Sequence, residues 1–484
     1  MTISSALSAA LTGLTASSRA ASVVSDNIAN ARTEGFGERS LTLSSIAHGA
    51  GRGVQVLGVT RSSDPVILGE RRSAGAAQGE AETRASFLLR IETLIGTPDS
   101  DASLPARFDT FETSLVSAAS RPDSQARLES VLNAAQQLAG TLNSISNGIQ
   151  DIRQQADAQI TTEITHLNRT LAAIHDLNGT IRTSISRGEN ALGLIDRQQV
   201  LIDGIADLVP IREVRNDAGM VSLYTIDGLS LVDGRPAEFG FSATPAITPL
   251  MSLQNNDLSG LTVNGRPIST SGSYASLSGG RLAALFAVRD EIAPQAQAQL
   301  DGLALDLTAR LDDPGLDPTR AATDPGLFSD DGLLASATYE QGLSARIMVN
   351  AAVDPDRGGA LWRLRDGLGA TSEGAPGDPT LLQGILDALQ ADRPTASAAF
   401  SATSRSMAEL ASDVLSLTSM DRLFAEARAA ETSGKFTALR EAELSRGVDT
   451  DRQMQRLLEI ENAYAANARV ISTLDDMLDQ LLGL

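Results

Sequence analysis

The fold is decided at the start of the chain, where residues 3–28 read ISSALSAALTGLTASSRAASVVSDNI. Apolar residues recur here at alternating spacings of four and three, which is the heptad pattern of a coiled-coil helix. The seam positions are Ile3, Leu7, Ala10, Leu14, Ser17, Ala21, Val24 and Ile28, and only Ser17 is polar. Gly35 and Gly37 follow, so we expect a helix over residues 2–30 that ends before them.

The last segment of the chain repeats this pattern. Its seam positions are Leu457, Ile460, Tyr464, Asn467, Ile471, Leu474, Leu478 and Leu481. Thr450 and Gln453 fit a capping box, and Asp449 and Asp451 would lie at the positive end of the helix dipole, which predicts a helix over 450–482.

Both seams are only two residues wide per heptad, which is typical of a coiled coil and narrower than the face of a helix in a globular core. We therefore expect the two terminal helices to pair with each other and to form an assembly interface. The alternative is that each helix packs on the body of its own domain. The polar residues Ser17 and Asn467 fit a device that fixes register, and they equally fit a tolerated imperfection.

Composition bounds the remaining possibilities. A chain of 484 residues is long enough for about three domains. Its net charge of −21 has the wrong sign for binding nucleic acid or an anionic membrane. The single lysine, Lys435, precedes Phe436, which excludes a P-loop, and the absence of cysteine excludes disulfides and thiolate ligands. No apolar run is long enough to cross a bilayer, so we expect no membrane insertion.

Between the termini the pattern is mainly helical. We expect amphipathic helices over 82–96 and 102–118, a long rod-like helix from Pro122 to about Arg187, and further helices over 190–208, 280–311 and 395–444. Residues 209–279 are rich in β-branched residues and contain the turn signals Asp227-Gly228, Asp233-Gly234 and Asn264-Gly265. The predicted fold class is mainly α, with paired terminal helices, a long-helix body and an inserted small antiparallel β domain.

These elements suggest a domain layout. Residues 1–50 and 445–484 would form the terminal coiled-coil domain, and residues 51–208, 280–311 and 343–444 the helical body. Residues 209–279 would form the inserted β domain. Residues 312–342 would form an acidic Pro/Gly loop, which we interpret as solvated because it lacks the Asp-x-Asp-x-Asp-Gly spacing of a calcium site.

Catalytic motifs are not apparent. The histidines are His48, His166 and His175, and the last two lie nine residues apart on opposite faces of one helix, so they cannot chelate the same metal. The run of residues 49–53 lacks the third glycine of a dinucleotide fingerprint, and no Gly-x-Ser-x-Gly elbow occurs. We expect no enzymatic activity, no cofactor and no metal.

Both ends carry a family resemblance. The stretch after the first seam contains Asn27, Asn30, Gly35 and Phe36 and resembles the segment that bacterial flagellar rod, hook and hook-associated proteins share after their first helix. Glu34 stands where that family usually has proline, and Phe36 where it usually has tyrosine. Residues 53–61 resemble the family's next stretch, and residues 445–449 with 461–478 resemble its closing helix.

Two internal stretches, residues 194–198 and 279–290, narrow the resemblance to the proteins of this family that join hook and filament. The resemblance implies a subunit that assembles with copies of itself in the flagellar axis, between the hook protein and the second hook–filament junction protein. It also implies synthesis in the cytoplasm and export to the flagellum, outside the cell, through the flagellar type III apparatus without a cleaved signal peptide. An export chaperone would bind the C-terminal helix.

Two other hypotheses remain open from the sequence. A hook or distal rod protein would share both terminal motifs, but those proteins are richer in β structure. An enzyme housed in the central body is the other alternative, and it lacks a credible set of catalytic residues.

Overall fold

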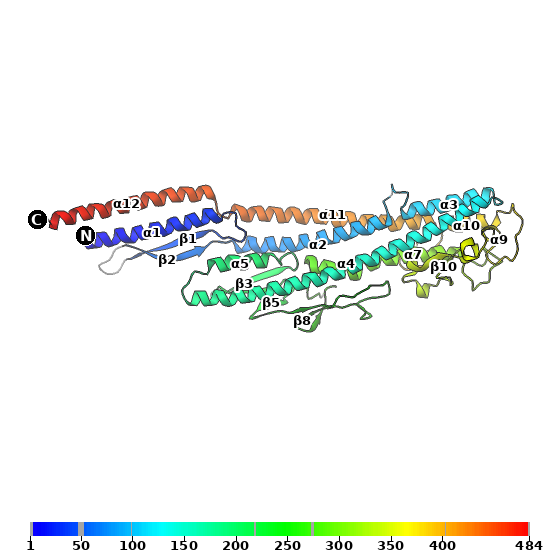
Figure 1. Ribbon diagram of the computed structural model, residues 1–484, viewed down its shortest axis with the longest axis horizontal. Coiled ribbons are helices and arrows are strands. Elements are labelled where there is room, and N and C mark those ends of the chain that lie inside the picture. Colours follow the sequence, from blue (N-terminus) through cyan, green and yellow to red (C-terminus); the bar gives the residue numbers. More distant parts are fainter. Residues whose placement is uncertain are drawn as a thin grey trace. The chain divides into compact units, whose positions relative to one another are not determined.

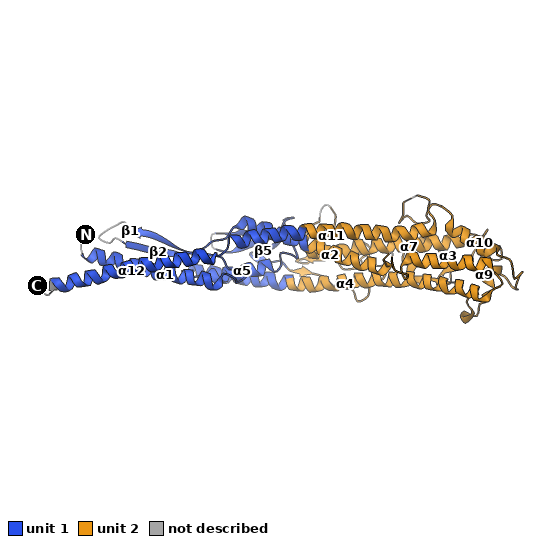
Figure 2. Cartoon of the chain, turned by 90° about the horizontal axis from the view of Figure 1, so that it is seen from above, with its two compact units in different colours: residues 1–78, 167–237, 432–484 blue, residues 79–166, 238–431 orange. Residues whose placement is uncertain are grey.

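A computed structural model describes residues 3–46, 53–97, 99–216, 219–272, 275–401 and 403–482. The chain divides into two compact units, drawn in different colours in Figure 2. Unit 1 contains residues 1–78, 167–237 and 432–484, and unit 2 contains residues 79–166 and 238–431. Three long helices contribute residues to both units.

Helices dominate the described chain (Figure 1). The three shared helices are α2 (Pro65–Ile95), α4 (Gln125–Ser186) and α11 (Met407–Ser445). Unit 1 adds α1 (Ile3–Asn30), α5 (Leu192–Asp203) and α12 (Thr450–Leu482). Unit 2 adds α3 (Leu104–Ser120), α6 (Gly280–Ala287), α7 (Ala293–Leu311), α8 (Leu343–Arg346), α9 (Arg363–Asp366) and α10 (Thr380–Gln390).

The strands form small antiparallel sheets. In unit 1, β1 (Arg39–Ile46) pairs with β2 (Gly53–Arg61), and a second sheet has the order β3 (Ile211–Arg215), β4 (Val221–Thr225), β5 (Ser230–Asp233), β6 (Arg235–Pro236). In unit 2, a sheet has the order β7 (Phe239–Gly240), β8 (Leu261–Val263), β9 (Arg266–Ile268), and β10 (Phe328–Asp330) pairs with β11 (Ile347–Val349).

The predicted hairpin turns are present at Asp227-Gly228, Asp233-Gly234 and Asn264-Gly265. At the last of these, both residues have positive φ, 52° and 76°, which is the backbone of a two-residue hairpin turn between β8 and β9. The strands of residues 209–279 nevertheless form two separate sheets rather than one inserted β domain. The periodicity of the sequence identifies strands and turns, but it does not show which strands pair with each other. For this reason it did not reveal that β3–β6 and β7–β9 form separate sheets.

The β1–β2 hairpin also departs from the expected layout, because the boundary placed at residue 50 falls between its two strands. Pairing runs from Arg39 opposite Arg61 to Ile46 opposite Gly53, with a bulge after Thr42. The hairpin therefore belongs as a whole to the unit that holds the terminal helices.

Aliphatic and phenylalanine side chains fill the core of unit 2. The residues that helix α3 buries completely are Leu104, Phe108, Phe111, Leu115 and Ala118. The rings of Phe111 and Phe328 pack edge to face, with their centroids 5.8 Å apart. Helix α10 buries Leu382, Ile385 and Leu389. This packing agrees with the low aromatic content of the chain, since Leu, Ile and Ala supply most of the core.

The predicted helix over 280–311 is interrupted by one π-helical turn, Val288–Ile292. The wider turn brings Arg289 to the interior, where its guanidinium is fully buried and bonds Asp157 at 2.7 Å and the Ser259 carbonyl at 3.0 Å. The rings of Phe241 and Phe286 lie within 5.4 Å and 5.1 Å of the same guanidinium. Asp290 accepts two further hydrogen bonds from this guanidinium, from Nε and Nη2, each at 2.8 Å. A buried cation needs such a set of partners to offset its desolvation.

The acidic segment 312–342 differs from the solvated loop that we expected. Asp317 is only 4% exposed and accepts hydrogen bonds from the backbone N–H groups of Thr319 and Leu368. Asp330 lies in β10 and pairs with Arg346 at 2.7 Å. Asp317 thus organises the loop from inside, because it accepts from backbone donors that the irregular chain leaves open, whereas Asp313, Asp324 and Asp331 are exposed as expected.

The mainly α class, the rod-like α4 and the paired terminal helices are confirmed.

Candidate functional site

Helices α1 and α12 lie side by side and run in opposite directions in unit 1 (Figures 1 and 2). On α12 the predicted seam is the less exposed face. Leu474 is buried, Leu457, Ile460, Asn467, Ile471 and Leu478 are half-buried, and Tyr464 is 45% exposed. The Leu481 side chain lies outside the described part of the chain. The narrow seam therefore covers one face of an otherwise exposed helix.

The seam predicted on α1 is less uniform. Ala10 and Val24 are buried, Ile3, Leu14, Ala21 and Ile28 are half-buried, and Leu7 is 37% exposed. The contacts with α12 instead include Asn27 and Gly13, each one position before a predicted seam residue. A second packing surface explains the difference, because α1 also packs on the β1–β2 hairpin, where Thr12 Oγ1 accepts from the Val54 N–H.

Asn27, a residue of the family motif, is fully buried where α1, the following loop and α12 meet. Its Nδ2 donates to the Arg39 carbonyl at 2.8 Å, and its Oδ1 accepts from the Arg39 N–H at 2.9 Å. Nδ2 also donates to Oε1 of Gln453 on α12 at 3.2 Å. One asparagine amide thus fixes the chain turn after α1 and reaches the partner helix.

Gln453 has a different role from the predicted capping box. Helix α12 begins at Thr450, and Asp449 caps it by accepting from the N–H groups of Asp451 and Arg452. Gln453 is fully buried, and its Nε2 donates to Glu38 Oε1 at 2.9 Å. The sequence identified the helix start correctly, but the cap belongs to the preceding aspartate.

The other motif residues shape the turn after α1. Asn30 bonds back to the Asp26 carbonyl and accepts from Thr33. Gly35 has a φ of 75°, and a Cβ there would lie 2.5 Å from Val200 of α5, so a side chain does not fit. Phe36 is half-buried with the Arg39 guanidinium 4.7 Å from its ring centre, while Glu34 is exposed.

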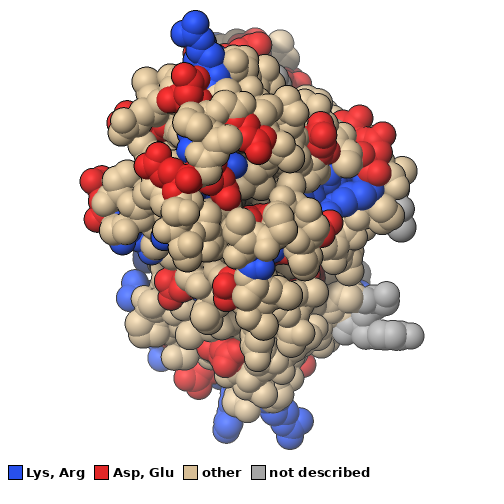
Figure 3. Space-filling model, turned by 90° about the vertical axis from the view of Figure 1, so that its right-hand side faces the viewer, with Lys and Arg blue, Asp and Glu red and all other residues tan. Residues whose placement is uncertain are grey.

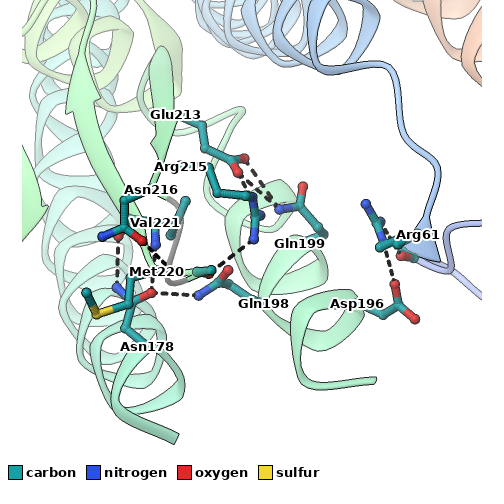
Figure 4. Close-up of polar contacts among 12 residues, drawn as sticks. Arg61, Asn178, Asp196, Gln198, Gln199, Glu213, Arg215, Asn216, Met220 and Val221 are labelled. Atoms are coloured by element: carbon teal, nitrogen blue, oxygen red, sulfur yellow. Dashed lines mark hydrogen bonds and ion pairs between the residues drawn. The ribbon is translucent and has the colours of Figure 1, made fainter. Parts of the chain in front are cut away.

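Asp196 of α5 anchors this turn. Its Oδ1 accepts from Arg61 Nε at 2.7 Å and from the Gly37 N–H at 3.3 Å, and its Oδ2 accepts from Arg39 at 3.1 Å. Figure 4 shows the pair of Arg61 and Asp196 beside α5. Asp196 lies in the internal stretch that carries the family resemblance, so that stretch holds the loop that follows α1.

The next residues of α5 connect it to its surroundings in unit 1 (Figure 4). Gln198 donates to Asn178 of α4 at 3.0 Å, and Asn178 pairs with both backbone groups of Val221 at 2.8 Å. Gln199 accepts from Arg72 of α2 at 2.8 Å. These amides satisfy donors and acceptors that would otherwise be buried without partners.

Arg72 is the cationic centre of this network, with its side chain 2% exposed. It bonds Asp203 and Glu213, each at 2.6 Å. Burial disfavours the charge of Glu213, yet the Arg72 and Arg215 guanidinium groups together hold the pKa of Glu213 below its usual value. The carboxylate therefore stays ionised and holds β3 to α2.

Three family models match the chain, two at its ends and one in its middle. The model described as the flagellar hook-associated protein FlgK helical domain matches residues 88–314. The flagella basal body rod protein model matches residues 7–36, and the C-terminal model of the flagellar basal body rod FlgEFG proteins matches residues 445–484. The chain is therefore similar to flagellar hook-associated protein 1 over its helical middle and to flagellar rod proteins at its two ends.

Individual relatives are distant. Flagellar hook-associated protein 1 of Salmonella typhimurium is 26% identical over 243 residues, 49% of this chain and 44% of the relative. The Bacillus subtilis protein of that name is 21% identical over 98% of this chain and 97% of its own. A solved structure of the hook junction protein FlgK from Burkholderia pseudomallei aligns with a TM-score of 0.44 and 20% identity, over 54% of this chain and 46% of that one. The chain thus spans about half the length of the Salmonella relative that it matches.

The two segments that match the rod-protein models contain α1 and α12, whose apolar surface is incompletely covered. Among the described residues of the two helices, seven large apolar side chains are more than a third exposed: Leu7, Leu11, Met454, Leu458, Tyr464, Val470 and Met477. An antiparallel pair leaves the outward faces of both helices open to further packing. Exposed apolar side chains of this kind are available for a contact with another protein.

Among the described residues, no group of three or more His, Asp or Glu side chains could hold a metal ion. His166 is exposed, His175 is half-buried, and His48 lies outside the described residues. On the face drawn in Figure 3, acidic groups are scattered with basic ones between them. In the parts of the chain that the structure describes, no helix is both long enough and apolar enough to span a bilayer.

Proposed function

We propose that this chain is a structural subunit of the bacterial flagellum that joins the hook to the filament. The observation that carries the proposal is the uncovered apolar surface of the α1–α12 pair, on the two segments that match the rod-protein models. Such a pair buries its remaining apolar side chains when copies pack around a common axis. The proposed role is mechanical and needs no catalytic group.

The named relatives guide the choice of partners. The subunit would contact copies of itself, the hook protein below and the second hook–filament junction protein above. It would leave the cytoplasm through the flagellar export apparatus, with an export chaperone on α12. The exposed side chains of α12, Met454, Leu458, Val470 and Met477, would give that chaperone an apolar surface before assembly.

A hook or distal rod protein is the second candidate, because both rod-protein models match the chain ends. The match of the hook-associated helical-domain model to residues 88–314 favours the junction role. The long helix α4 within that range is consistent with it.

The test is complementation of a strain that lacks the gene. We expect the deletion strain to make hooks without filaments and to release unpolymerised flagellin. The wild-type gene should restore filaments, whereas the variant Leu11→Asp, Leu458→Asp should not. Both leucines are 58% exposed, so the change alters the surface and leaves the fold of the monomer intact.

The control is Asn462→Asp, which adds a charge at another exposed position of α12. It should restore filaments. Secretion of each variant is measured in parallel, because only a variant that is exported but not incorporated reports on assembly. Normal filaments in the deletion strain would refute the junction role.

A further inference from the structure

The pairing of α1 with α12 raises a question of register. Both helices carry heptad repeats of small or aliphatic residues, and a shift of one helix by one heptad would still place one apolar seam against the other. Apolar contacts alone therefore select the register weakly. Polar contacts select the register more strongly, because a buried polar group that loses its hydrogen-bond partner still bears the cost of its removal from water.

The first polar contact joins Asn27 to Gln453. Both side chains are fully buried, and 3.2 Å separate Asn27 Nδ2 from Gln453 Oε1. Neither amide is free to turn away, because the Arg39 backbone holds Asn27 and Glu38 holds Gln453. A shift by one heptad would leave both amides facing groups that cannot replace these bonds.

The second contact is steric. Gly13 faces Asn467, and a Cβ at Gly13 would lie 2.8 Å from Asn467 Nδ2 and 3.0 Å from Oδ1. The asparagine amide thus occupies the space that the absent side chain of Gly13 leaves. In another register Asn467 would meet a residue with a side chain, and the helices would have to separate locally.

The two contacts agree on one register. Gly13 lies two heptads before Asn27, and Asn467 lies two heptads after Gln453, as one register of antiparallel helices requires. We propose that Gln453 and Asn467 are the specificity-determining residues of the terminal pair, which select this one antiparallel register over heptad-shifted ones. The proposal concerns pairing within the chain and does not depend on the flagellar role.

Cysteine cross-linking can read the register, because the chain contains no cysteine. In an antiparallel pair, residues that lie opposite each other have a constant sum of residue numbers, and this sum is 480 for both contacts. The pair Ala9→Cys, Ile471→Cys has the same sum and therefore matches the proposed register. The pairs Ala9→Cys, Tyr464→Cys and Ala9→Cys, Leu478→Cys report a shift of one heptad in either direction. Mild oxidation of the dilute full-length chain should link the matched pair at least about tenfold faster than either shifted pair.

The selecting residues are then replaced by an apolar residue of similar size. In the Gln453→Leu, Asn467→Leu background we expect the preference for the matched pair to fall to within about threefold. An unchanged preference would overturn the proposal. So would equal linking of matched and shifted pairs in the otherwise unaltered chain, or a matched product with the mass of a dimer.

A compensation experiment covers the possibility that the double leucine variant does not fold. Gly13→Ala alone should slow linking of the matched pair, because the new Cβ collides with Asn467. Adding Asn467→Ala should restore the rate, because it removes the colliding amide. Failure of Gly13→Ala to slow the linking, or of Asn467→Ala to restore it, would contradict the proposed contact.

Discussion

The substitution Leu474→Asp tests how independent the terminal pair is of the rest of the chain. Leu474 is 8% exposed and is the one α12 seam residue that is buried within the described part of the seam. Helix α12 packs on α1, and most of its remaining surface is exposed. A change at Leu474 therefore acts on the pairing of these two helices.

The expected magnitude follows from burial and charge. Loss of a buried leucine side chain removes about 2 kcal/mol, and an unpaired carboxylate at the same position adds at least about 2 kcal/mol of desolvation. A total of about 4 kcal/mol lowers the equilibrium constant for pairing by about 1,000-fold. The pair should then be open in most molecules.

Two spectroscopic signals separate the terminal pair from unit 2. The single tryptophan, Trp362, lies in unit 2, so its fluorescence reports on that unit, while far-ultraviolet circular dichroism reports on all helices. In Leu474→Asp we expect helical signal to be lost at a lower temperature, with the Trp362 transition unchanged. Under the proposed junction role, the exported variant should not be incorporated into the flagellum.

The matched control is Ser472→Asp, which places the same charge at an exposed position two residues away. It should leave both signals unchanged. The reasoning fails if the Trp362 transition in Leu474→Asp moves by as much as the helical signal. That result would mean that α12 belongs to a core shared with unit 2.

Two further predictions concern buried carboxylates. Asp196→Ala should lower the free energy of unfolding by about 3 kcal/mol in urea titrations, because it leaves the shielded guanidinium groups of Arg39 and Arg61 without their common partner; a loss below about 1 kcal/mol would contradict this role. Burial raises the pKa of Asp312 to about 6, against the hydrogen bond from the Gly326 N–H. A carboxyl group with a raised pKa binds its proton more tightly in the folded state, so stability falls as the pH rises from about 4 to about 6. Asp312→Asn should therefore stabilise the protein by about 1–2 kcal/mol at pH 7 and have no effect below pH 4, and a stabilisation independent of pH would refute the assignment.

Local properties of the chain were accessible from the sequence. Heptad spacing identified both terminal helices, because the periodicity of a helix is set by residues three and four apart. The lack of proline between Pro122 and Arg187 indicated α4, and the Asn264-Gly265 turn was identified because few residues adopt two successive positive φ angles. The family motif at Asn27 marked the residue on which the turn after α1 depends.

Partners distant in the sequence were decided only by the tertiary structure. Gln453 has the spacing of a capping residue, yet it is buried against Asn27, which lies near the opposite end of the sequence. In the sequence, Asn467 is only a polar residue in an apolar seam, and the structure shows that it packs against Gly13 of α1. In the same way, the sequence does not reveal that Asp196 of α5 binds Arg39 and Arg61. The sequence of one helix determines which of its faces is apolar, whereas the partner of a buried polar group depends on which distant segment the folded chain brings within about 3 Å of it.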